Sequence, residues 1–197
     1  MKPNFIRCLF FSLAFILSAS SIFAIELKSD DGNYIVTVPG TWTVSFQNQS
    51  GFSISSSDGS RTMTLITANI GSGKLDSSYI TEFEQKLLKA GLKKISSRMF
   101  TIDGVPAYEI IQRSGKAQYA SVMVDHQIIA NSKLYGLHAS VMGGDATRDS
   151  EMQAGLASFH FLQQPKPSRV GSLGVKLTVV GIIIAGIVFF VVRSRTT

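Results

Sequence analysis

Histidine is the residue type in this chain best suited to acid–base or metal chemistry, and the histidines are His126, His138 and His160. A two-residue turn at Asn131-Ser132 pairs Ala130 with Lys133 and places Asp125 directly opposite His138 on neighbouring strands. A cross-strand carboxylate and imidazole can hold a metal ion or move a proton. Asp125 and His138 are therefore the candidate metal-binding or hydrolytic residues. The alternative interpretation is a pair that only makes local hydrogen bonds.

The same pairing predicts where the other two histidines lie. His126 falls opposite Leu137 on the apolar face of the two strands. His160 stands between Phe159 and Phe161, so alternation turns it away from the core when both phenylalanines face inward. We predict no catalytic role for either histidine.

Lys86, Lys89 and Lys93 form the candidate interaction surface. Their spacings of three and four residues place them on one side of a predicted helix. There they could contact anionic lipid headgroups or an acidic protein. The alternative is an ordinary solvated helix face that Glu82 and Glu84 balance.

Known catalytic motifs do not occur in the sequence. It has no His-Glu-x-x-His, Gly-x-Ser-x-Gly, Walker or dinucleotide-binding pattern. The only tryptophan, Trp42, follows a tight Pro-Gly turn and is expected to fill the core. The alternative is a pocket beneath Trp42, which would make the chain a small-ligand carrier. We therefore expect a non-enzymatic protein without a cofactor.

Runs of β-forming residues separated by turn signals predict mainly strands. The expected strands cover residues 34–38, 42–47, 52–56, 61–69, 94–102, 105–112, 118–130, 134–142 and 158–162. Asp58-Gly59 predicts a hairpin with a turn of the primed type. Because two helices accompany these strands, the pattern predicts an α+β sandwich, in which helices cover an antiparallel sheet.

The two predicted helices have recognisable ends. The first covers residues 77–90, with Asp76 as N-cap and Gly91 as C-cap. The second covers residues 150–157. The apolar stripe of the first helix is Ile80, Phe83 and Leu87, and that of the second is Met152, Leu156 and Phe159.

Three segments resemble the PsbP-like family, which includes the photosystem II extrinsic protein and a Ran-binding nuclear import factor. They are Val38-Pro39-Gly40-Thr41-Trp42, the Ile-Asp-Gly-x-Pro-Ala-Tyr stretch from Ile102 to Tyr108, and Ser158-Phe159-His160-Phe161. The resemblance implies a PsbP-like α+β domain over residues 25–162 and a binding or assembly role without enzymatic activity. The matching residues are turn and core positions, so no functional residue is carried over.

The two ends of the chain have the pattern of targeting segments. Residues 1–24 resemble a secretory signal peptide, with Lys2 and Arg7 before an apolar run. Residues 163–172 form an expected linker, residues 173–192 an expected transmembrane helix and residues 193–197 a basic tail, which the positive-inside rule places in the cytoplasm. Gly181 and Ala185 would allow two such helices to pack as a homodimer.

The net charge of +6 comes mostly from the ends, because five of the nineteen lysines and arginines lie outside residues 25–170 and none of the thirteen acidic residues does. The region between them is almost neutral, which argues against a nucleic-acid partner.

Loss of the signal peptide would remove the only cysteine, Cys8. An exported domain without cysteine favours a bacterial setting. We therefore expect a single-pass protein of the bacterial cytoplasmic membrane, with its domain outside the cytoplasm and a protein partner there.

Overall fold

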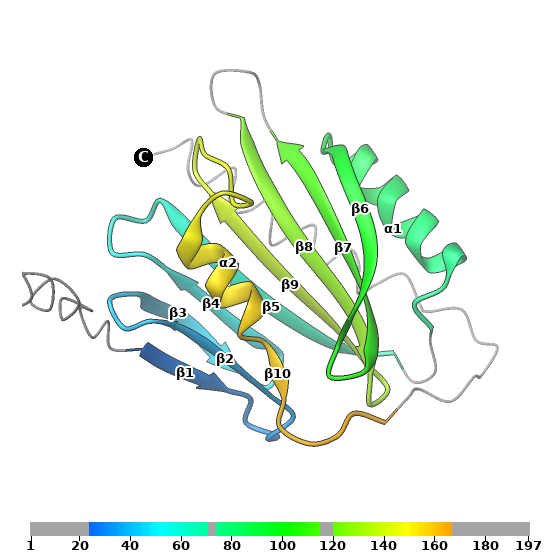
Figure 1. Cartoon of the computed structure of the whole chain (residues 1–197), viewed down its shortest axis with the longest axis horizontal. Coiled ribbons are helices and arrows are strands. Elements are labelled where there is room, and N and C mark those ends of the chain that lie inside the picture. Colours follow the sequence, from blue (N-terminus) through cyan, green and yellow to red (C-terminus); the bar gives the residue numbers. More distant parts are fainter. Residues whose placement is uncertain (1–23, 71–73, 115–119, 167–197) are drawn as a thin grey trace, which may run out of the picture.

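The computed structural model describes residues 24–70, 74–114 and 120–166, which build two antiparallel sheets and two helices (Figure 1). The larger sheet has seven strands in the order β3-β4-β5-β9-β8-β7-β6, and the smaller has three in the order β1-β2-β10. The elements are β1 (Ala24–Lys28), β2 (Tyr34–Pro39), β3 (Thr43–Asn48), β4 (Gly51–Ser55), β5 (Arg61–Asn69), α1 (Ser77–Lys89), β6 (Lys93–Ile102), β7 (Val105–Ser114), β8 (Ser121–Ala130), β9 (Lys133–Val141), α2 (Ser150–Ala157) and β10 (His160–Phe161).

The seven-stranded sheet is covered on both faces. On the α1 face, residues Tyr108, Ile110, Met123, Ile129 and Leu134 form a core with Tyr79, Phe83 and Leu87 of α1. On the opposite, α2 face, residues Ala107, Val124, Ile128, Tyr135 and Leu137 pack against α2 and the small sheet. The predicted α+β class is confirmed. The separate three-stranded sheet was not predicted, and neither was its strand β1. Together with β2 and β10, β1 covers part of the α2 face.

Two hairpin turns test the sequence predictions. Asn131 and Ser132 have φ angles of 53° and 60°, so the predicted two-residue turn between β8 and β9 is confirmed and Ala130 pairs with Lys133. The primed turn predicted at Asp58-Gly59 is wrong, because only Gly59 has a positive φ, of 69°. The Asp58 carboxylate accepts a hydrogen bond from the Ser60 backbone at 3.0 Å, which stabilises a different turn.

Helix α1 begins and ends close to its predicted positions. The Asp76 side chain accepts from the Tyr79 backbone N–H at 3.0 Å, which confirms the N-cap. Gly91, with a φ of 83°, ends the helix. Of the predicted apolar stripe, Phe83 and Leu87 are buried and Ile80 is half-buried against the same core, which Tyr79 also joins.

The predicted signal peptide, transmembrane helix, cytoplasmic tail and Gly181–Ala185 pair lie outside the described residues, apart from Ala24. Among the helices of the described ranges, none is both long and apolar enough to cross a bilayer.

Candidate functional site

Asp125 and His138 lie opposite each other, as predicted, and form a buried pair on the α1 face. They are directly opposite in the β8–β9 register, and the distance from Asp125 Oδ1 to His138 Nδ1 is 2.8 Å. The Asp125 side chain is 1% exposed and that of His138 is 10% exposed. The Gln112 side-chain amide donates to the second Asp125 oxygen. Because both carboxylate oxygens have protein partners, the pair has a local structural explanation.

Asp125 and His138 continue across the sheet into a row of polar side chains that includes Thr64 and Ser53. Since Nδ1 faces Asp125, Nε2 is the nitrogen left for a third group. Thr64 lies directly opposite His138 on β5, and its hydroxyl is 3.1 Å from that of Ser53 on β4. Within the described parts of the chain, no group of three or more His, Cys, Asp or Glu side chains gathers to hold a metal ion. The row is thus a carboxylate, an imidazole and two hydroxyls.

A second histidine–carboxylate pair, which the sequence analysis missed, lies on the α2 face. His126 and Glu109 are opposite in the β7–β8 register, and His126 Nε2 is 3.0 Å from Glu109 Oε2. Arg98 on β6 donates from Nε to Glu109 Oε1 at 2.7 Å. The hydrogen bond with His126 lowers the pKa of Glu109 to about 2, because it and the Arg98 bond together outweigh the opposing effect of burial. Glu109 therefore stays ionised at neutral pH.

The Glu109 cluster lies in a cleft with a volume of about 380 Å³. Strands β6, β7 and β8 form its floor, and Thr147 and Gln153 form a wall at the start of α2. The other residues that line it include Ser96, Arg98, Glu109, Ile111 and Val124. Nothing in the sequence pattern alone joins these residues, because they meet only through the β6–β7–β8 register and the position of α2.

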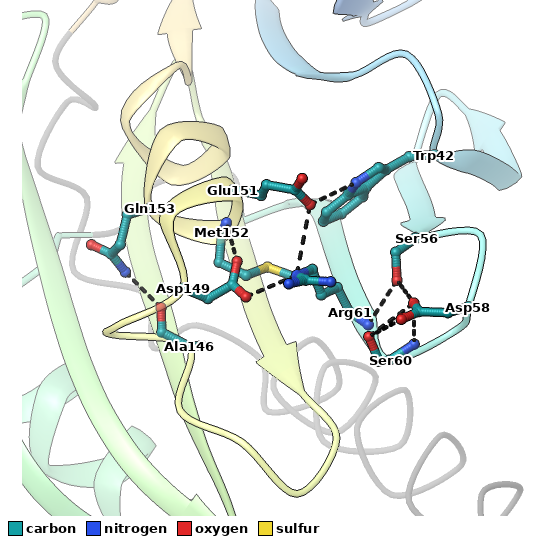
Figure 2. A network of polar contacts seen from close by, with 10 residues as sticks. All are labelled: Trp42, Ser56, Asp58, Ser60, Arg61, Ala146, Asp149, Glu151, Met152 and Gln153. Atoms are coloured by element: carbon teal, nitrogen blue, oxygen red, sulfur yellow. Dashed lines mark hydrogen bonds and ion pairs between the residues drawn. The ribbon is translucent and has the colours of Figure 1, made fainter. Parts of the chain in front are cut away.

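Trp42 belongs to a polar network that fixes the start of α2 (Figure 2). Its indole N–H donates to Glu151 at 3.3 Å, and Arg61 on β5 binds Asp149 at 2.8 Å and Glu151 at 3.6 Å. Asp149 also caps α2 by accepting from the Met152 backbone at 3.1 Å. Trp42 is 5% exposed, which confirms a core role. Trp42 is not among the residues that line the cleft around Glu109.

The three candidate lysines do not share one helix face. Lys86 and Lys89 lie in the last turn of α1, but Lys93 is the first residue of β6, so that part of the prediction is wrong. The reason is the left-handed conformation of Gly91, which ends the helix before Lys93. Lys86 is also paired with Glu82 at 2.7 Å, whereas Lys89 and Lys93 have no acidic partner among the described residues.

His160 points to solvent, as the alternation between Phe159 and Phe161 predicted. Its side chain is 59% exposed, while the two phenylalanines are 1% and 9% exposed. His160 Nδ1 lies 3.2 Å from an Asp103 oxygen. It is therefore a surface residue that contacts the β6–β7 turn.

Comparison with solved structures places this arrangement in a known fold. A solution structure of cyanobacterial PsbP (CyanoP) from Synechocystis sp. PCC 6803 matches with a TM-score of 0.54 and 13% identity, covering 73% of this chain and 95% of that one. The chain has a PsbP-like fold, as its turn and core motifs predicted. A crystal structure of LpqN, described as involved in cell envelope biogenesis of Mycobacterium tuberculosis, matches with a TM-score of 0.46 and 14% identity, covering 70% of this chain and 90% of that one. No protein-family model and no curated sequence matches.

Proposed function

We propose that the chain is a non-enzymatic binding module of PsbP-like fold that a single C-terminal helix anchors in the bacterial cytoplasmic membrane, with its domain outside the cytoplasm. The observation that carries the proposal is the apolar segment at 177–192, which has no charged residue and is followed directly by Arg193 and Arg195. The signal-like segment at 1–24 supports export of the domain that lies between them.

The exit of the chain from the domain supports a defined orientation. The Lys166 backbone N–H donates to Asn131 Oδ1 at 2.8 Å, and the Lys166 carbonyl accepts from the Asn131 N–H at 3.1 Å. The segment that leads to residues 173–192 is thereby held at the tip of the β8–β9 hairpin. Only residues 167–172 remain as spacer, with a reach of about 19 Å in polyproline form. In the proposed topology, this hairpin tip faces the membrane.

That orientation favours a protein partner for the lysines over lipid headgroups. In the strand register, Lys93 on β6 lies opposite Arg113 on β7, and Arg113 lies opposite Val122 near the start of β8. Val122 and Ala130, at the hairpin tip, are eight residues apart, which corresponds to about 26 Å along a strand. Lys89 and Lys93 would therefore lie at the end of the domain away from the bilayer, where an acidic protein could reach them.

Membrane fractionation tests the anchor. The full chain is expected to resist alkaline carbonate extraction and to be digested by protease added to spheroplasts. A matched variant that ends at Lys166 should keep the described domain and appear in the soluble extracytoplasmic fraction. Equal release of both forms would contradict the anchor.

A metal or hydrolytic role for Asp125 and His138 is the second candidate function, since their hydrogen bond leaves His138 Nε2 for another group. Metal analysis of the purified full chain separates the two. The binding module is expected to carry no stoichiometric metal. Zinc or copper at one ion per chain, lost in His138→Ala and kept in His160→Ala, would favour the second candidate.

A further inference from the structure

The α2 face of the large sheet is covered unevenly. Helix α2 contacts β2, β5 and β9, and it leaves β6 and β7 uncovered (Figure 1). The segment before α2 pairs with Val122 of β8, and the cleft of about 380 Å³ lies where Thr147 and Gln153 meet residues of β6, β7 and β8. Its floor includes the side chains of Ile111 and Val124, and its polar groups come from β6, β7 and α2. A volume of this size is in the range of sites that bind small molecules, about 300 to 1,000 Å³.

The charged groups of the cleft are held in place before any ligand arrives. Glu109 accepts from Arg98 at 2.7 Å and contacts His126 at 3.0 Å, so its carboxylate is fixed from two sides. Its side chain is only 12% exposed, whereas that of Arg98 is 68% exposed. The charges of Arg98 and Glu109 cancel, so the cleft has little net attraction for an anion or a cation.

Several hydrogen-bonding groups of the cleft have unused capacity. Arg98 uses two of its five N–H donors on Glu109. The Gln153 side-chain amide donates to the Ala146 carbonyl at 2.9 Å, and the Gln153 side-chain oxygen has no partner among the described residues. The Ser96 hydroxyl, which also lines the cleft, has no described partner either. The cleft thus offers donors and acceptors side by side, and a hydroxyl group satisfies both.

We propose that this cleft binds a small uncharged molecule with several hydroxyl groups, such as a monosaccharide, disaccharide or cyclic polyol. The hydroxyls bond to Arg98, Gln153 and the remaining lone pair of Glu109. The C–H face of the ring packs on Ile111, which is half-buried, with the fully buried Val124 beneath it. The inference goes beyond the proposed function and does not depend on the membrane anchor, since every group in it belongs to the described domain.

Titration of sugars into the full chain tests the site. The protein is purified in a zwitterionic detergent without a sugar headgroup, and binding is followed by isothermal titration calorimetry. Probes are sucrose, trehalose, N-acetylglucosamine and myo-inositol, with acetate and ethylammonium as charged comparisons. At least one uncharged probe is expected to bind with a dissociation constant of millimolar or below. Binding of only a charged probe, or of no probe at up to 50 mM (about 50 times the weakest expected constant), would overturn the proposal.

Two matched variants on β6 locate the binding. Ser96 is exposed on the α2 face, so Ser96→Phe fills the cleft without removing a described contact, and affinity should fall at least tenfold. Thr101 is exposed on the opposite face of the same strand, and Thr101→Phe should leave affinity within twofold of the original. Unchanged binding in Ser96→Phe, or equal losses in both variants, would place the sugar elsewhere and overturn the assignment.

Discussion

Asp125 and His126 are consecutive on β8, and each belongs to a different histidine–carboxylate pair on opposite faces of the same sheet. Asp125 contacts His138 at 2.8 Å on the α1 face, and His126 contacts Glu109 at 3.0 Å on the α2 face. The alternation of a strand makes this possible without any turn in the backbone. One short segment of β8 therefore places a buried polar group in both layers of the domain.

The buried Asp125–His138 pair should show strong energetic coupling. In a double-mutant cycle with Asp125→Ala, His138→Ala and the double variant, we expect a coupling free energy of about 1–3 kcal/mol, because either single change leaves a buried partner unpaired. Urea unfolding followed by the fluorescence of Trp42, the only tryptophan and 5% exposed, measures it. Strictly additive effects would contradict the pairing.

Glu109 should contribute to acid sensitivity. Its pKa is about 2 in the folded chain against an ordinary value of 4.5, so its stabilisation is complete above pH 4.5 and is lost as the pH falls towards 2. The loss should be about 3 kcal/mol at most. Glu109→Gln is therefore expected to flatten the stability profile between pH 4.5 and 2. The exposed Glu26→Gln should keep the original slope, and identical slopes in all three proteins would argue against the Glu109 cluster.

Gly51 should be the glycine least tolerant of a side chain among those described. Its φ is 134°, and a Cβ there would lie 1.8 Å from the Leu65 carbonyl oxygen, which is backbone and cannot move aside. Gly51→Ala should cost about 3 kcal/mol or more of unfolding free energy. Gly59→Ala is the control, because Gly59 has a φ of 69° and open space, so only about 1 kcal/mol of backbone strain is expected. Similar losses would contradict the close approach of β4 and β5.

The polar network at the start of α2 should depend on Asp149 more than on Glu151. Asp149 caps the helix and binds Arg61 at 2.8 Å, whereas the Glu151 side chain is 39% exposed and lies 3.6 Å from Arg61. Asp149→Ala should destabilise the fold by about 1–2 kcal/mol and Glu151→Ala by about 0.5 kcal/mol. Thermal unfolding of both variants measures the difference, and the reverse order would show that the Trp42 contact dominates.

The Asp125–His138 pair could be predicted from sequence because a two-residue turn fixes the register of β8 and β9. The Glu109–His126 pair could not, because the connection between β7 and β8 is longer and leaves their register open. A register shift between Lys94 and Ser96 similarly moves Arg98 relative to β7. Local signals therefore specify hairpins with tight turns, and they do not specify clusters that need three strands in register.

Strand β1 was missed for a related reason. It has five residues, two of them charged, and its pairing with β2 depends on tertiary packing more than on its own pattern. Helix α2 was predicted at its observed boundaries, because the spacing of Met152 and Leu156 is a local signal. The prediction for Lys93 was wrong because it applied helical spacing beyond Gly91, the residue at which α1 was predicted to end and does end.

The position of β1 would have a consequence for the order of events in the proposed export. Ala24, its first residue, pairs with Pro39, and the predicted signal-peptide cleavage follows Ala24. A protease needs the chain around the scissile bond free of other partners, so cutting must precede the docking of β1 on β2 or wait for its release. Cleavage of the signal peptide and the docking of β1 on β2 would then be competing processes. Variants that slow the docking of β1 should be processed faster than the original chain.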